Sequence, residues 1–256
     1  METKTVFITG ANRNTGLAIA KRFAEEGYQV AISSRSLEKA QETAAELEKT
    51  YKIKTKGYGL SLRDINEIKK VFADIKETFG GLDVFVGNSA HLGVDQEFLR
   101  VTEEEFDEVV DVNMKANYFC SQQAALLMKE KKKGSIVLIG SVHYRAVIWG
   151  RSLYSSTKGA MATMIKSLAF ELAEYGIRVN QVVPGAIRTE RYDDMSEETL
   201  AKRRENWPMG VESTGEDIAN GVYYLASDQA RTITGTDLTI DSGITACLLT
   251  YNGGKH

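Results

Sequence analysis

The sequence predicts an α/β protein with a doubly wound, seven-stranded parallel sheet in a three-layer α/β/α arrangement. Short apolar runs rich in β-branched residues recur between longer amphipathic stretches, a pattern typical of repeated βαβ units. Some runs, such as residues 136–139, are apolar on both faces, as expected for parallel strands that helices cover on both sides. Such sheets bind ligands beyond the carboxyl ends of their strands.

Seven runs are expected to be strands. They are Thr5–Thr9, Tyr28–Ser33, Thr55–Leu60, Leu82–Gly87, Ser135–Gly140, Arg178–Val183 and Leu238–Ile240. Thr102 stands before three glutamates and is expected to cap a helix, since acidic residues suit the positive helix end. Ser36 is expected to be a weaker cap, and a further helix is expected to begin near Ser152.

The composition predicts one domain, spanning residues 1–256, because no linker or low-complexity run interrupts the chain. The formal charge of -3 argues against a nucleic-acid partner, and the basic run at 129–133 is expected to end a helix. The two cysteines and three histidines lack ligand spacing, so no disulfide or metal site is predicted. No signal peptide or membrane-length apolar run is recognised, so we expect a cytoplasmic protein without a membrane partner.

A glycine-rich turn lies directly between the first predicted strand and the following helix. It reads Gly10, Ala11, Asn12, Arg13, Asn14, Thr15 and Gly16. At this place, glycines let the backbone approach a pyrophosphate and helix N–H groups point at it. An ordinary βα turn is the alternative, which the βαβ context disfavours. We expect Asn14 to adopt left-handed backbone geometry, which asparagine tolerates best among non-glycine residues.

Tyr154 and Lys158 lie four residues apart and therefore share one face of a predicted helix. An ammonium group beside a phenol favours the phenolate and is expected to lower the tyrosine pKa towards neutrality. Ser141 lies thirteen residues before Tyr154, at the carboxyl end of the fifth predicted strand. Although a Tyr-x-x-x-Lys pair alone is common on surfaces, its place beside this crevice predicts an acid/base site.

Together these motifs resemble the short-chain dehydrogenase/reductase family, over almost the whole chain. The turn is similar to the family's Thr-Gly-x-x-x-Gly-x-Gly loop, with Asn14 in place of the middle glycine. Ser141, Tyr154, Lys158 and Asn113 match its catalytic tetrad. The resemblance implies a Rossmann-like fold in which Tyr154 exchanges a proton with the substrate oxygen and Ser141 hydrogen-bonds the developing alkoxide. It also implies that Lys158 binds the nicotinamide ribose and that Asn113 holds a water.

The resemblance places the cofactor along the carboxyl ends of the strands. The expected contacts are Gly10, Asn12, Arg13, Asn14, Thr15, Gly16, Ser34, Arg35, Ser36, Leu60, Ser61, Leu62, Asn88, Ser89, Ala90, Tyr154, Lys158, Pro184, Gly185, Ile187 and Thr189. No carboxylate follows the second strand, where NAD binders hold the ribose diol. Arg35 and Arg13 can grip a 2′-phosphate instead, so NADP(H) is predicted, with two solvated surface arginines as the alternative.

The segments expected to face the substrate are polar. The predicted contacts are Ser141, His143, Arg151, Tyr154, Arg191 and Trp207, with a lid over about residues 189–212. This lining favours a sugar, a polyol or a small hydroxy/keto acid. A 3-ketoacyl-carrier or hydroxysteroid reductase is the alternative of the same chemistry, and it gains if the polar side chains point outward and an apolar channel leads to Tyr154.

Two further expectations concern the state of the protein. A non-catalytic NADP(H)-binding sensor is the alternative of another class, because Asn14, Gly87 and Ala90 depart from the family motifs. The segment 244–251 is apolar for a chain end, and members of the resembled family pack such ends across a tetramer interface. A homotetramer is therefore predicted.

Overall fold

A computed structural model describes residues 3–95, 97–192, 194–205 and 207–247, with the side chain of Arg191 outside the described part. Seven parallel strands form one sheet in the order β3-β2-β1-β4-β5-β6-β7, which confirms the predicted fold class. The strands are β1 (Thr5–Ile8), β2 (Gln29–Ser34), β3 (Thr55–Gly59), β4 (Val84–Gly87), β5 (Gly134–Ile139), β6 (Ile177–Pro184) and β7 (Asp237–Ile240). Each lies within two residues of a predicted strand.

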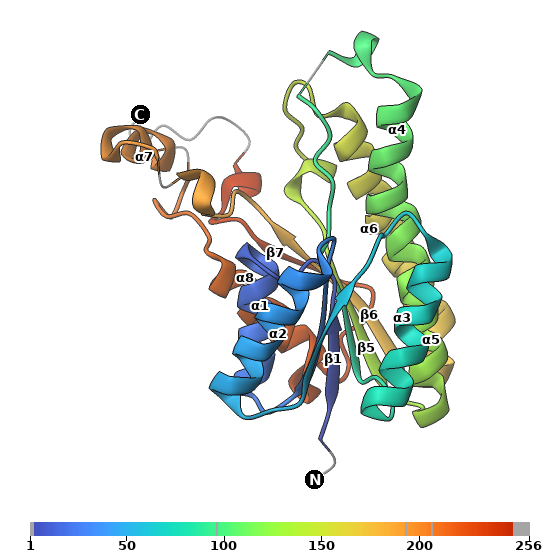
Figure 1. The fold of residues 1–256 in the computed structure, drawn as a ribbon. Coiled ribbons are helices and arrows are strands. Elements are labelled where there is room, and N and C mark those ends of the chain that lie inside the picture. The colour runs from blue at the N-terminus through green and yellow to red at the C-terminus, as the bar shows by residue number, and fades with distance from the viewer. Residues whose placement is uncertain (1–2, 96, 193, 206, 248–256) are drawn as a thin grey trace.

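Helices cover both faces of the sheet and complete the three layers (Figure 1). They are α1 (Asn14–Glu25), α2 (Leu37–Tyr51), α3 (Ile65–Phe79), α4 (Glu103–Val110), α5 (Ala116–Lys131), α6 (Ser152–Leu172), α7 (Glu197–Arg204) and α8 (Gly215–Ala226). Figure 1 shows α1, α2 and α8 on one face and α3, α5 and α6 on the other. None of the described helices is long and apolar enough to cross a bilayer.

Alternate side chains of each strand fill two separate cores. Phe7 of β1 packs with Phe72 of α3 in one core, whereas its neighbours Val6 and Ile8 pack with Phe23 of α1 in the other. This alternation is the two-residue period of a strand buried on both faces. The sheet is thereby held rigidly between two apolar layers, and the loops at its carboxyl edge have a firm base.

The predicted helix caps are present. Thr102 Oγ1 accepts a hydrogen bond from Glu105 N at 3.3 Å, and the Glu105 carboxylate accepts one from Thr102 N at 3.0 Å, which completes a capping box. Ser36 Oγ accepts from Lys39 N at 3.3 Å. Helix α6 begins at Ser152, as predicted.

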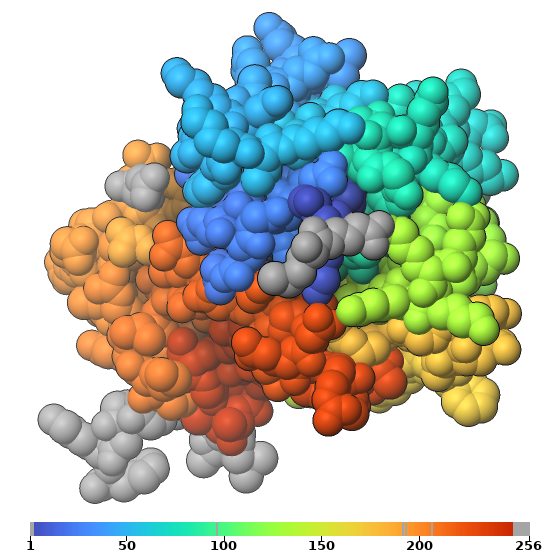
Figure 2. All heavy atoms as spheres, turned by 90° about the horizontal axis from the view of Figure 1, so that it is seen from below, coloured from blue at the N-terminus to red at the C-terminus, as the bar shows by residue number. Residues whose placement is uncertain are grey.

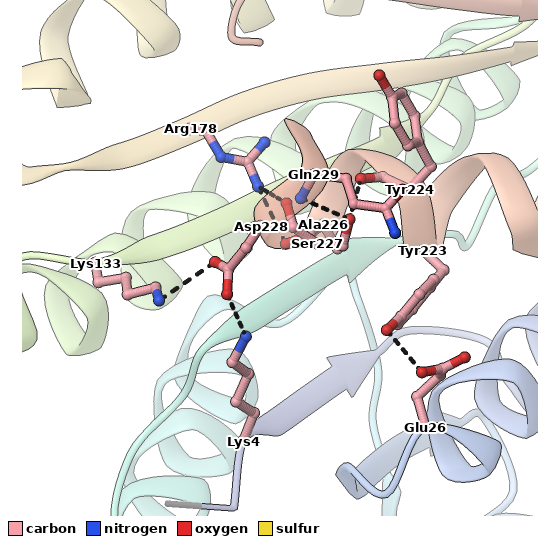
Figure 3. Close-up of polar contacts among 10 residues, drawn as sticks. All are labelled: Lys4, Glu26, Lys133, Arg178, Tyr223, Tyr224, Ala226, Ser227, Asp228 and Gln229. Carbon is pink, nitrogen blue, oxygen red and sulfur yellow. Dashed lines mark hydrogen bonds and ion pairs between the residues drawn. The ribbon is translucent and has the colours of Figure 1, made fainter. Parts of the chain in front are cut away.

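A polar cluster closes the amino end of the sheet (Figure 3). The Arg178 guanidinium of β6 donates hydrogen bonds to four main-chain carbonyls at and after the end of α8, those of Leu225, Ala226, Ser227 and Ile233. Asp228 pairs with Lys4 at 3.1 Å and with Lys133 at 3.3 Å. Figure 2 looks onto this end, where the dark blue start of the chain lies between green and orange segments. Three distant parts of the chain therefore meet here, away from the carboxyl edge.

Candidate active site

The two glycines of the turn after β1 stand where a side chain would not fit. A Cβ on Gly16 would lie 2.3 Å from Gly10 O, and one on Gly10 would lie 2.5 Å from Ser89 Oγ. Asn14 has φ +49°, which confirms the expected left-handed backbone. Arg13 precedes α1 without a capping side-chain hydrogen bond, so the first N–H groups of this helix are left for an anion.

Asn88, which follows β4, holds the glycine turn through side-chain hydrogen bonds. Its Nδ2 donates to Thr9 O at 2.9 Å and to Gly10 O at 3.0 Å. Thr9 Oγ1 accepts from Asn88 N at 3.1 Å and from Ser89 N at 3.2 Å. The Asn88 amide is thus used in joining the ends of β1 and β4, while Ala90 is exposed beyond it.

The end of β2 lies beside the end of β1, because Ile32 pairs with Ile8 and Ala11 N donates to Ser33 O at 3.0 Å. Ser34 is buried and its hydroxyl accepts from Ser36 N. The side chains of Arg35 and Arg13 are both exposed at this edge. Two guanidinium groups therefore follow neighbouring strands.

The end of β3 contributes less. Leu60 is buried, and Leu62 is partly buried against the core on the α3 side of the sheet. Ser61 is exposed, and its N–H donates to the Glu67 carboxylate at 2.8 Å. Of the three residues predicted here, Ser61 alone has an exposed side chain.

The Tyr154, Ser141 and Lys158 side chains meet at the end of β5. All three are buried, with 8%, 6% and 1% of their surface exposed. Lys158 Nζ donates to Ile139 O at 2.7 Å and lies 5.6 Å from the centre of the Tyr154 ring. Burial lowers the Lys158 pKa to about 8. The structure thus brings together three of the four predicted catalytic groups in one buried cluster.

The pKa of Tyr154 departs from the expected direction. Burial raises it, while a hydrogen bond with Ser141 and the positive charge of Arg151 act to lower it. The Lys158 ammonium, which was expected to lower the Tyr154 pKa, is itself desolvated and donates its hydrogen bond to the Ile139 carbonyl.

Asn113, the fourth predicted catalytic residue, is fully buried in a π-helical turn, Asp111–Lys115, between α4 and α5. Its Oδ1 accepts from His91 N at 2.7 Å, and its Nδ2 donates to His91 O at 2.9 Å and to Thr157 Oγ1 at 3.1 Å. Thr157 lies next to Lys158 in α6. Asn113 therefore joins the loop after β4 to the helix that carries Tyr154.

Several predicted substrate contacts have protein partners instead. Arg151 Nη1 donates to Leu92 O at 2.8 Å, and its Nε pairs with Asp95. Trp207 is 6% exposed. His143 does face the site, since its ring packs edge-on against Tyr154 with centroids 5.9 Å apart.

The structure reveals an apolar groove that the sequence interpretation missed. It holds about 640 Å³, and its lining includes His143, whose ring packs against Tyr154, together with the polar residues Glu97, Tyr144 and Ser155. Its apolar walls come from two loops and consist of Phe98, Leu99, Val147, Ile148 and Trp149, each more than half exposed. Three consecutive apolar residues in a loop at 147–149 were the available signal, because such runs are rare on surfaces unless they bind something.

Comparisons with known proteins agree with this architecture. A family model described as "Enoyl-(Acyl carrier protein) reductase" matches residues 10–245. The chain is 35% identical to 3-oxoacyl-(acyl-carrier-protein) reductase FabG of Staphylococcus aureus, over 94% of this chain and 98% of that protein. It is 34% identical to a 3alpha-hydroxysteroid dehydrogenase of Mediterraneibacter gnavus, over 94% of this chain and 96% of that protein.

The chain belongs to the short-chain dehydrogenase/reductase family. The solved structure of acetoin dehydrogenase YohF from Salmonella typhimurium matches with a TM-score of 0.86 at 28% identity, covering 95% of this chain and 98% of that one. This short-chain dehydrogenase/reductase is therefore an oxidoreductase that acts on CH–OH groups. These relatives confirm neither a sugar nor a polyol substrate, and they give the sensor alternative no support.

Two features of this short-chain dehydrogenase/reductase fit a nicotinamide dinucleotide. The glycines of the turn let the chain pass tightly from β1 into α1, whose amino end is the kind of site that binds a pyrophosphate. After β6, which ends at Pro184, Gly185 N donates to Ile240 O at 2.9 Å, and Ile187 forms a bridge with Ser213. Thr189 follows them with a buried hydroxyl that has no partner among the described residues. A carboxamide would satisfy this hydroxyl.

Proposed function

We propose that this short-chain dehydrogenase/reductase is an NADP(H)-dependent reductase of ketones that carry an apolar chain, such as 3-oxoacyl thioesters. The observation that carries the substrate class is the apolar groove beside Tyr154. Arg151, one of the polar side chains that had favoured a sugar, is bound to Leu92 O and Asp95 instead. A hydroxyl-rich substrate would leave the apolar walls of the groove unmatched.

The buried cluster supports proton transfer at a substrate oxygen. Tyr154 donates its phenolic proton during reduction and accepts it during oxidation. Ser141 hydrogen-bonds the oxygen on which charge develops. Lys158, fixed by Ile139 O, holds a positive charge 5.6 Å from the Tyr154 ring centre and would bind the nicotinamide ribose. Asn113 would hold the relay water predicted for it. The bound cofactor supplies or accepts the hydride.

The preference for NADP(H) rests on Arg13 and Arg35. Both are exposed after neighbouring strands, with Ser34 at the end of β2 and Ser36 at the start of α2. A dianionic 2′-phosphate would form charge-assisted hydrogen bonds with the two guanidinium groups. No carboxylate stands between residues 31 and 37 to hold a ribose diol.

The remaining cofactor, substrate and assembly assignments are proposed with the same function. The chain is one domain whose segment 189–212 acts as a substrate lid, and it works as a cytoplasmic homotetramer. Exposed apolar side chains on three neighbouring helices support assembly, namely Phe106, Tyr118, Leu126 and Phe170. Light scattering after size-exclusion chromatography tests this, and a monomeric mass would refute it. Of the apolar end at 244–251, residues 248–251 lie outside the described residues.

A substrate panel tests the function. Purified protein is assayed with NADPH and with NADH against 3-oxoacyl thioesters of several lengths, a 3-oxosteroid, acetoin, and sugars or polyols. We expect the highest kcat/KM with NADPH and a medium-length 3-oxoacyl thioester. Tyr154→Phe should lower kcat by about 10²–10⁴-fold with cofactor affinity retained. A preference for sugars would overturn the substrate class, and equal turnover by Tyr154→Phe would overturn the acid/base role.

A further inference from the structure

Arg151 lies where the substrate groove meets the acid/base cluster. It precedes the first residue of α6 and stands three residues before Tyr154. Its side chain is only 15% exposed. A small cavity is lined by Arg151 and Tyr154 together with Leu92 and Gly93 of the loop after β4. The guanidinium group therefore reaches the same space as the phenol.

The contacts of Arg151 hold the loop after β4. Nη1 donates to Leu92 O at 2.8 Å, and Nε pairs with Asp95, whose side chain is 63% exposed. The preceding residue, His91, is held at both its N–H and its carbonyl by Asn113. Two consecutive residues of this loop are thus bound by different side chains. Asn113 of the π-helical turn binds His91, and Arg151 at the start of α6 binds Leu92.

Arg151 also supplies charge to the phenol. Burial raises the pKa of Tyr154, and the Ser141 hydrogen bond and the Arg151 charge oppose that rise. The other groups that face Tyr154 are Lys158 from its own helix and His143 from the segment after β5.

Two carboxylates complete the surroundings of this charge. Glu105 of α4 lines the cavity shared with Arg151, and Asp95 binds the guanidinium from the solvent side. The Asp95 carboxylate is largely exposed, so water screens it more than it screens the buried guanidinium. The Arg151 charge acts to lower the Tyr154 pKa even though Asp95 is paired with the guanidinium.

We propose that Arg151 is a positioning residue that fastens the loop after β4 to the start of α6 and keeps a positive charge beside the Tyr154 phenol. The role rests on the proposed acid/base function of Tyr154. Because the loop forms a wall of the site, its attachment fixes the substrate carbonyl relative to the phenol. The charge favours the phenolate and so sets the pH at which Tyr154 exchanges its proton.

The test compares Arg151→Gln, which removes the charge, with Arg151→Lys, which keeps the charge but loses the planar two-sided contact. Asp95→Asn loosens the loop without removing the cation. Arg231→Gln is the charge-matched control, because Arg231 is exposed near the amino end of the sheet. Phenol titration is followed by ultraviolet difference spectra of each cofactor-free variant against the same variant carrying Tyr154→Phe. The pH dependence of kcat and KM is measured in parallel.

We expect Arg151→Gln to move the Tyr154 titration and the pH–rate profile to higher pH and to raise KM roughly tenfold. Arg151→Lys should keep the wild-type titration with a raised KM, and Asp95→Asn should raise KM alone. Unchanged titration and KM in Arg151→Gln, or an equal shift in Arg231→Gln, would overturn the proposal. If circular dichroism shows Arg151→Gln unfolded, Arg151→Met replaces it, because it keeps the apolar stem.

The two proposals fail in different ways. If wild type reduces no ketone while the Tyr154 titration still responds to Arg151, the proposed function is wrong and the charge effect stands. If ketones are reduced and the titration ignores Arg151, the function stands and this inference is wrong.

Discussion

The ammonium nitrogen of Lys158 lies 5.6 Å from the centre of the Tyr154 ring, and it donates its hydrogen bond to the main chain of β5 at Ile139. Because only 1% of the lysine is exposed, its ammonium group is shielded from water. It makes one short hydrogen bond to the protein instead. A group kept charged at such a site at the expense of folding stability is typical of functional positions.

Lys158→Met should make the stability difference from wild type depend on pH. The folded pKa is about 8 against an ordinary value of 10.5, so below pH 8 the buried charge costs on the order of 3 kcal/mol. Between these two values the unfolded wild-type chain binds more protons, and wild-type stability rises with pH. Lys158→Met should therefore have a higher free energy of unfolding than wild type near pH 7. Urea denaturation should show this difference shrinking as the pH rises to 10. A difference independent of pH would contradict the lowered lysine pKa.

Arg35→Asp should reverse the cofactor preference. The arginine is exposed after β2, where a carboxylate would bind ribose hydroxyls and repel a 2′-phosphate. The loss of charge-assisted hydrogen bonds should weaken NADPH binding by roughly 10- to 100-fold and leave NADH binding equal or tighter. Fluorescence titration with each dinucleotide measures this, with Arg231→Asp as the charge-matched control. Equal weakening of both dinucleotides would argue against a 2′-phosphate site.

Asn14→Ala should destabilise the protein by about 1 kcal/mol, because alanine lacks the tolerance of asparagine for a positive φ. Asn14→Gly should stay near wild type, since glycine adopts this conformation freely. Lys52→Ala is the matched control: Lys52 has φ +57°, and lysine and alanine meet the same backbone penalty there. Thermal denaturation compares all three, and an unchanged midpoint for Asn14→Ala would refute the argument.

The sequence was sufficient for the strands and for much of the site because both depend on local order. Residues close in sequence determine the strand periodicity, the caps at Thr102 and Ser36 and the backbone of Asn14. The partners of Arg151 and the His91 partner of Asn113 could not be predicted, because they lie on the loop after β4, whose path is set by packing. The two walls of the apolar groove are about fifty residues apart in the chain, so only the fold shows that they face each other.

Arg178→Ala should destabilise the protein by about 3 kcal/mol, because four carbonyls at and after the end of α8 lose a charged donor. Asp228→Asn is the contrasting change. Its side chain is 67% exposed, so the lost pairs with Lys4 and Lys133 should cost under about 1 kcal/mol. Urea denaturation ranks the two variants, and activity per folded molecule should be unchanged in both. An Asp228→Asn effect equal to that of Arg178→Ala would show that the ion pairs dominate.

Trp149→Ser should reduce activity in proportion to substrate length. The indole is 77% exposed on one wall of the groove, so only substrates long enough to reach it lose apolar contact. We expect kcat/KM to fall roughly tenfold for a long 3-oxoacyl thioester and to stay within twofold for a short one. Tyr175→Ser, which changes an exposed side chain just after α6 and outside the groove, is the control. An equal loss at every chain length would place Trp149 outside the substrate path.

The π-helical turn at Asp111–Lys115 has a consequence for how such a site can change. The turn contains one residue more than a regular α-helix would have at this place. This extra residue rotates α4 about the helix axis by about 100° relative to α5. Deleting Val112 would restore an unbroken α-helix and swing α4 around its axis, carrying Glu105 and Val109 away from the cavity that they line. The loss of this one residue would therefore move one side of that cavity and leave every strand of the sheet in place.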